Sequence, residues 1–285
     1  MNPLLSLARL SGQPLLLRQD CHHLPLLLAR RIMEPKSEQL SPTSPTGAMK
    51  PWEAREAVTL LPGGIAVVPC HGMLCAGLDQ LTAWYYDVCR PEAIQAACNL
   101  LAGRADVTKV AFNFDSPGGY TTAISETAEM VALLGQLKVT VAFTAGMMCS
   151  AAYWLGSQCS QIVATRSSTV GSVGTYATIY DYSEYFTKEG IATHVIRAGT
   201  LKGIGVLGDK VTPDQLAFLQ GNVDRINAGF LAAVASGRGP SRPLASADTQ
   251  GQWFDGETAV AKNLADGLAL NLPELLAELS AAPAV

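Results

Sequence analysis

Short apolar runs alternate with stretches of helical spacing along the chain from about residue 55 onwards. The apolar runs predict β-strands over residues 65–69, 107–114, 139–144, 161–164 and 193–196. Apolar positions three and four residues apart predict helices over residues 91–101, 121–137, 150–159 and 212–235. Because strands that alternate with helices are joined by parallel crossovers, this pattern predicts an α/β domain.

The beginning of the chain has a different character. Residues 1–34 carry short apolar clusters interrupted by arginines, and residues 35–54 have the Ser- and Pro-rich composition of a linker. We therefore predict an N-terminal arm over 1–34, a Ser/Pro-rich linker over 35–54 and one folded domain over 55–285. The leucine-rich start lacks a basic segment and a small-residue cleavage site, so we do not expect it to be a secretory signal.

Composition and charge narrow the possible functions. The 285 residues carry a net charge of -4 with scattered Lys and Arg, which argues against a nucleic-acid partner. No apolar run reaches the length of a membrane helix, so we expect a cytoplasmic protein without a membrane partner. The seven cysteines include no C-x-x-C pair and the four histidines have no metal-ligand spacing. We therefore expect buried thiols, no metal and no cofactor.

A first candidate site is the turn Ser116-Pro117-Gly118-Gly119, which follows the predicted strand 107–114. Backbone N–H groups in a glycine turn can point at an anion. An ordinary strand-to-helix turn explains the same residues. A phosphate site is a further alternative, although the GxxxxGK[ST] pattern is absent from the sequence.

Ser150 is a second candidate, because it stands where a predicted strand and a short glycine-containing connection lead into a predicted helix. A serine in this place exposes its hydroxyl, and the N–H of the next residue is free to bind an oxyanion. Taken alone, Ser150 is better explained as a residue that caps the helix N-terminus.

Two further segments contain candidate polar residues, Gly171-Ser172-Val173-Gly174 and Ala198-Gly199-Thr200-Leu201-Lys202-Gly203. Lys202 lies in an apolar stretch that would partly desolvate its ammonium group, although most lysines are solvated surface residues. A free lysine has a pKa of ~10.4, and burial can lower that pKa far enough to make the amine a base.

The order and spacing of these segments resemble those of the serine peptidases of the signal peptide peptidase A type, family S49, including phage head maturation proteases. The resemblance covers roughly residues 64–268. It rests on HGxL at 71–74, DSPGG at 115–119, GxxxSAAY at 146–153, GSVG at 171–174, AGTLKG at 198–203 and FDGxxAxxxxLADG at 254–267. The resemblance implies the Clp protease/crotonase-like ββα superhelix and a homo-oligomer, a tetramer or a larger ring.

The resemblance also assigns roles to the matching residues. It implies that Ser150 is the nucleophile, that Lys202 is the general base and that Ser172 holds the lysine amine. The N–H groups of Gly119 and Ala151 match the donors of the oxyanion hole. The chain departs from the family pattern at Gly203, where an acidic residue or alanine is more usual.

Other functions remain open at this stage. A Ser-His-Asp triad would need His194, the one histidine after Ser150, and we expect this residue to be non-catalytic. A crotonase-like acyl-CoA enzyme would need carboxylates near the oxyanion site, where Asp115 is the obvious one. Within the peptidase interpretation, we expect a phage protease that cleaves capsid or scaffold proteins, or its own N-terminal arm, in the host cytoplasm or the procapsid. A soluble host-type peptidase and a non-enzymatic assembly component are the alternatives.

Overall fold

Four parallel strands form the centre of the large sheet. They are β3 (Ile65–His71), β6 (Lys109–Ser116), β8 (Val139–Cys149) and β9 (Gln161–Ala164), and each pairs in parallel with the next. The computed structural model describes residues 15–17 and 49–282. The predicted arm and linker lie mostly outside the described residues, so their boundaries remain predictions.

The ends of the large sheet are built from short strands. β2 (Thr59–Leu61) pairs antiparallel with β3, β10 (Thr169–Gly171) pairs parallel with the last residues of β8, and β11 (Trp253–Asp255) pairs antiparallel with β10. The strand β12 (Gly267–Leu268) pairs with β9. The predicted parallel α/β arrangement is confirmed by this strand order.

A second, four-stranded sheet lies beside the C-terminal ends of β6 and β8. Its order is β1 (Leu15–Leu17), β7 (Gly118–Tyr120), β4 (Met73–Leu74) and β5 (Val88–Cys89). The strand β7 follows β6 after a single residue, so the chain passes directly from the large sheet into the small one. This passage contains the turn Ser116-Pro117-Gly118-Gly119, the first candidate site predicted from the sequence.

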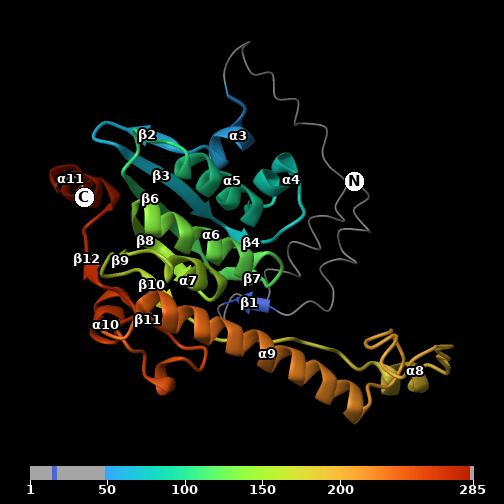
Figure 1. Ribbon diagram of the computed structural model, residues 1–285. Helices are drawn as coiled ribbons and strands as arrows, with labels where there is room; N and C mark the ends of the chain where they lie inside the picture. Colours follow the sequence, from blue (N-terminus) through green and yellow to red (C-terminus); the bar gives the residue numbers. More distant parts are fainter. Residues whose placement is uncertain (1–14, 18–48, 283–285) are drawn as a thin grey trace.

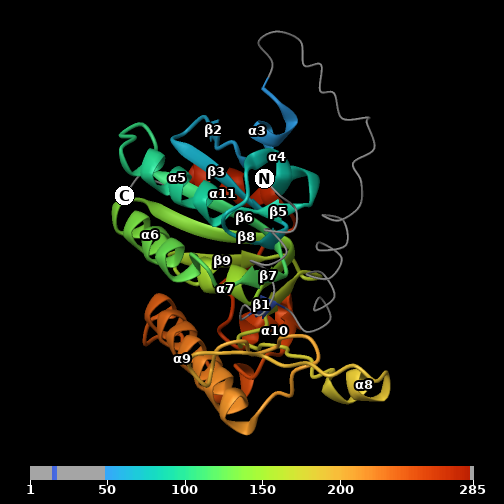
Figure 2. The same cartoon turned by 90° about the vertical axis from the view of Figure 1, so that its right-hand side faces the viewer.

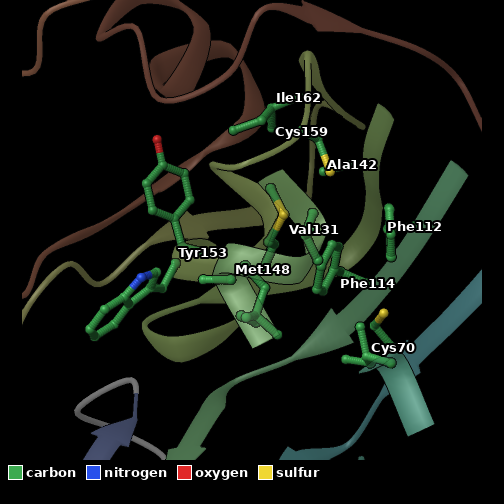
Figure 3. Close-up of a cluster of buried hydrophobic side chains, with 14 of the residues drawn as sticks. Cys70, Phe112, Phe114, Val131, Ala142, Met148, Tyr153, Cys159 and Ile162 are labelled. Atoms are coloured by element: carbon green, nitrogen blue, oxygen red, sulfur yellow. The ribbon is translucent and has the colours of Figure 1, made fainter. Parts of the chain in front are cut away.

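Helices cover both faces of the large sheet (Figures 1 and 2). Because side chains alternate along a strand, Phe112 and Phe114 face one layer and Ala111 faces the other. The first layer contains α5 (Pro91–Ala102), α6 (Ile124–Leu137) and α7 (Ala151–Gly156). Figure 3 shows Met148 and Tyr153 among the buried side chains of this layer. The second layer is formed by α11 (Leu272–Ala281).

The longest helix, α9 (Pro213–Arg238), extends away from the sheets and has a projecting segment at its far end. Its 26 residues correspond to about 39 Å at 1.5 Å per residue. Figures 1 and 2 show α8 (Ser183–Lys188) and the loops around it beside the N-terminal end of α9, away from the body. We call residues 175–212 the projecting segment. The helix α9 confirms the prediction over 212–235.

The remaining short elements complete the connections. They are α3 (Pro51–Glu56), α4 (Gln80–Tyr85), a 3-10 turn (Ser246–Asp248) and α10 (Gly256–Ala261). None of the helices in the described part of the chain is both long and apolar enough to cross a membrane. The expectation that the cysteines are buried is confirmed for the six described ones, and Cys21 lies outside the described residues.

One predicted strand is wrong. Residues 193–196 form no strand in the structure and lie in the projecting segment, where Ile196 is 96% exposed. A short apolar run needs a neighbouring strand to satisfy its backbone groups, and the sheets of the body lie elsewhere. The apolar side chains of this segment therefore contribute to an exposed surface.

Candidate active site

Ser150 lies between the end of β8 and the start of α7, in a backbone conformation that is rare for serine. Its φ of 54° and ψ of -118° fall in a region that favours glycine, and its side chain makes no hydrogen bond that caps α7. The hydroxyl instead lies 3.5 Å from the carbonyl oxygen of Gly174. The helix-capping interpretation is therefore wrong. Strained residues of this kind cluster at catalytic sites, where they typically cost about 1–3 kcal/mol.

Ser172 lies close to Ser150 because β10 runs parallel to the end of β8. Cys149 is paired with Gly171, and the N–H of Ser150 donates to the Gly171 carbonyl at 2.7 Å. Ser172 also has a positive φ of 54°, and its N–H donates to the carbonyl of Gln252 at 2.6 Å. Both serines therefore lie in strained turns directly after the paired ends of the neighbouring strands β8 and β10. A cavity of about 550 Å³ opens beside them and is lined by Ser172 and Gly174 and by the polar face of α9.

The glycine turn lies next to the same edge. Ser116 is paired with Met148, two residues before Ser150, and the N–H of Gly118 donates to the Ser116 hydroxyl at 3.3 Å. The strand β7 then packs against α7. The structure therefore brings the turn and the start of α7 together, as the sequence predicts.

Only glycine fits at position 119. A Cβ atom there would lie 1.9 Å from the carbonyl oxygen of Leu74 in β4, and that oxygen belongs to the backbone and cannot move away alone. The backbone of β7 thus approaches β4 more closely than any side chain allows.

We expect Gly119→Ala to lower the free energy of unfolding by about 2 kcal/mol or more, because overpacking of this severity must separate β7 from β4. Urea unfolding measures the effect. Gly221→Ala is the matched control, since a Cβ at this helical position meets no atom within 4 Å and alanine favours a helix by about 1 kcal/mol. An unchanged unfolding midpoint for Gly119→Ala would contradict the close approach.

Ala151 is the first residue of α7, and its position determines what its backbone can do. The N–H groups of a first helical turn have no acceptor inside the helix. The residue is fully buried and directly follows Ser150. Its N–H therefore has no acceptor within the helix, and its role as an oxyanion donor remains a prediction.

The structure does not bring Lys202 to Ser150 within one chain. Lys202 is exposed in the projecting segment, and the carbonyl of nearby Thr200 accepts a hydrogen bond from Gln215 at the start of α9. The helix α7 instead contacts α9 where Trp154 stacks on Phe230, with ring centroids 4.8 Å apart. These two positions on α9 are 15 residues apart, which is about 22 Å along the helix. In the single chain the apolar stretch leaves Lys202 exposed, so the partial desolvation expected there would have to come from substrate or a neighbouring copy.

The competing catalytic groups are not placed for chemistry at Ser150. His194 is exposed in the projecting segment. His71 is half-buried, and burial lowers its pKa, so its neutral ring accepts a hydrogen bond from Asn113 at 3.1 Å. Asp115, the carboxylate that an acyl-CoA enzyme would use, accepts the backbone N–H of Met147 at 3.1 Å. This contact gives Asp115 a structural role in the turn.

A buried ion-pair network lies next to α7, the helix that follows Ser150. This network was not predicted from the sequence. Arg238, at the end of α9, forms two hydrogen bonds of 2.8 and 2.7 Å with Asp266, and its side chain is 1% exposed. The hydroxyl of Tyr153 in α7 donates to the neighbouring carbonyl of Leu264 at 3.0 Å. Burial raises the pKa of Tyr153, which keeps the phenol protonated as a donor. The network thus fixes α7 and α9 to the C-terminal part of the domain.

These features define a class of protein. A buried, strained serine at a strand-to-helix turn, beside a glycine turn with backbone donors, is typical of enzymes that form an acyl intermediate. The order of the parallel strands and the second, four-stranded sheet fit the Clp protease/crotonase-like ββα superhelix.

Comparison with known proteins identifies the family. The model of peptidase family S49 matches residues 133–280, and the chain belongs to this family. The chain is 27% identical over 205 residues to the head-tail preconnector protein GP5 of Enterobacteria phage P21, covering 72% of this chain and 40% of that protein. It is also 27% identical over 205 residues to capsid assembly protease C of Escherichia phage lambda, covering 72% and 46%. The chain thus spans less than half the length of both relatives.

One solved structure has the same general outline. It is a membrane-bound stomatin-specific protease in complex with a substrate peptide, with 14% sequence identity and a TM-score of 0.42. The alignment covers 76% of this chain and 80% of that one.

Proposed function

We propose that this chain is a serine endopeptidase with Ser150 as its nucleophile. The observation that carries the proposal is the conformation of Ser150, because a non-glycine residue persists at such φ and ψ only where its surroundings impose them. In the reaction, the Ser150 hydroxyl attacks the peptide carbonyl while a base takes its proton, the N–H groups of Gly119 and Ala151 bind the oxyanion, and the C–N bond breaks as the base passes the proton to the leaving amine. Water then releases the acyl group from Ser150.

We propose that the general base is Lys202 of a second copy of the chain, held by Ser172 beside Ser150. The distance along α9 supports this, since the lysine of the same chain lies beyond the reach of its own nucleophile. The cavity beside Ser172 supports it too, because the buried side-chain oxygen of Asn227 in its lining has no hydrogen-bond partner among the described residues and can accept one from an incoming lysine amine. Enclosure between two copies would supply the desolvation that a lysine base requires.

The surface of the projecting segment supports a homo-oligomer. Large apolar side chains are exposed there and on the adjoining start of α9, and they are Tyr180, Tyr182, Tyr185, Ile191, Ile196, Leu207, Leu216 and Phe218. Contiguous exposed apolar surface of this kind is typical of an interface. We propose a tetramer or a larger ring in which each projecting segment contacts a neighbouring body.

The relatives guide the proposal for the substrate. Both are phage proteins, and one is described as a capsid assembly protease. We propose that this chain cleaves phage capsid or scaffold proteins, or its own N-terminal arm, in the host cytoplasm or inside the procapsid. A host-type signal peptide peptidase A-like enzyme is the second candidate, since the chain is 26% identical to a putative signal peptide peptidase of Enterococcus faecium over 56% of its length.

The proposed function can be tested by cleavage of an unfolded protein such as casein and by labelling with a fluorophosphonate. We expect one label per chain, located on Ser150 by mass spectrometry. His194→Ala should keep both labelling and kcat/KM within about twofold of the wild type, because its ring lies far from the nucleophile. Labelling at another serine would overturn the assignment of Ser150, and loss of cleavage in His194→Ala would restore the triad.

A further inference from the structure

The strand β1 occupies the edge of β7 beside the candidate active site. Leu15 is paired with Tyr120, Leu16 with Gly119 and Leu17 with Gly118, all in antiparallel register. Figures 1 and 2 show β1 next to β7 and close to α7. A segment far away in the sequence therefore lies along the same glycines that are proposed to hold the oxyanion.

Without β1, β7 would be the outer strand of a sheet of three strands, β7, β4 and β5. An outer strand presents unpaired backbone N–H and C=O groups, and an extended peptide can bind to them as an added strand. Gly118 and Gly119 have no side chains, so recognition at these positions depends on the backbone and tolerates many sequences. Such an edge suits an enzyme that must hold different extended polypeptides beside its nucleophile.

We infer that β1 occupies the edge of β7 in place of an extended substrate and thereby restrains the enzyme. This inference rests on the proposed peptidase function, because it names the regulation of the same site. The strand belongs to the same chain as β7, so it pairs without a bimolecular step and at a high effective concentration. A substrate must displace it before it can reach Ser150.

The chain contains a matched control for this inference. Pro14-Leu15-Leu16-Leu17 is followed eleven residues later by a second copy of the same four-residue motif, Pro25-Leu26-Leu27-Leu28, and the first copy contains β1 while the second lies outside the described residues. Proline has no N–H, and its ring fixes φ at about -65°, far from the φ of about -140° of an antiparallel strand. Leu16→Pro should therefore disrupt β1, whereas Leu27→Pro introduces the same substitution outside it.

A binding experiment tests the inference without any cleavage. Both proline substitutions are made in the full-length Ser150→Ala protein, and a fluorescent peptide of residues 12–19 is titrated against each while its anisotropy is followed. We expect the peptide to bind Leu16→Pro about tenfold or more tightly than Leu27→Pro, because the edge is then vacant. A peptide that itself carries Leu16→Pro should bind neither protein. Equal affinity of the unmodified peptide for both proteins would overturn the inference.

An activity measurement separates this inference from the proposed function. With Ser150 intact, we expect Leu16→Pro to raise kcat/KM for casein about tenfold over both the wild type and Leu27→Pro. Equal kcat/KM in two active variants would overturn restraint by β1 and leave the peptidase standing. A clear difference in peptide affinity, with no cleavage by any variant, would support the pairing of β1 and count against the peptidase.

Discussion

Mixing Ser150→Ala protein with Lys202→Ala protein should restore cleavage that neither variant has alone. Each substitution on its own is expected to lower kcat by at least about 10⁴-fold, because it removes either the nucleophile or the base. In the mixture, a copy with an intact Ser150 can receive Lys202 from a neighbour that carries Ser150→Ala. At equal amounts and with free exchange of copies, about a quarter of the sites should then be complete.

The measurement is the rate of casein cleavage after the two variants have been mixed and allowed to exchange. The double variant Ser150→Ala/Lys202→Ala, mixed with wild-type protein in place of either single variant, controls for effects of assembly alone. If the two single variants are each inactive and their mixture stays inactive although mixed oligomers form, the lysine is not donated between copies. The assignment of Ser150 would then be tested by the fluorophosphonate label alone.

Asp266→Asn should lower the free energy of unfolding by about 3–5 kcal/mol, the second large effect that we expect. The substitution leaves the guanidinium of Arg238 buried without its carboxylate, and an unpaired buried charge is strongly destabilising. Arg238→Met should cost less, because Arg242 and the N–H of Ile162 still bind Asp266 at 2.7 Å each. The double variant Arg238→Met/Asp266→Asn should recover part of the loss, since it removes both charges.

Urea unfolding of the single and double variants measures this coupling. The exposed pair of Arg166 and Glu257 serves as the control, because their side chains are 75% and 58% exposed and Arg166→Met should cost less than about 1 kcal/mol. Additive effects of Arg238→Met and Asp266→Asn would contradict a coupled network.

The same network makes a prediction for pH. Burial raises the pKa of Asp266, but hydrogen bonds from Arg238 and Arg242 outweigh it, and the net shift is downward. A carboxyl whose pKa is lowered by folding stabilises the protein above its unfolded pKa, which is about 3.9, and loses this effect as pH falls through the folded value. The stability difference between wild type and Asp266→Asn should therefore be constant above about pH 5 and shrink below about pH 4. A difference that grows on acidification would contradict this sign.

Much of the body could be predicted from the sequence because local patterns decide it. The strand at 161–164 has the predicted bounds, and the helices at 91–102 and 213–238 differ from prediction by a few residues. The strand predicted over 193–196 is absent because the apolar side chains there lie on a surface that is exposed in the single chain. Apolar periodicity cannot distinguish residues that pack in their own core from residues that pack on another copy.

The candidate site was predictable only in part. The family resemblance implied that Ser150, Ser172 and the glycine turn belong together, and parallel pairing of β8 with β6 and β10 brings them together. The distance of Lys202 depends on the length and direction of α9, which no local pattern records. The pairing of β1 with β7 could not be predicted either, because a run of three leucines does not indicate which strand it pairs with.

The outward position of Lys202 has a consequence for when such an enzyme would act. On the proposed mechanism, a dilute copy would hold a nucleophile without a base, so the rate per chain should rise with protein concentration instead of staying constant. Confinement of many copies within a closed shell would then start proteolysis, and dilution after escape from the shell would stop it. The length of α9, 26 residues, would in this way make the catalytic rate depend on the local concentration of the protein.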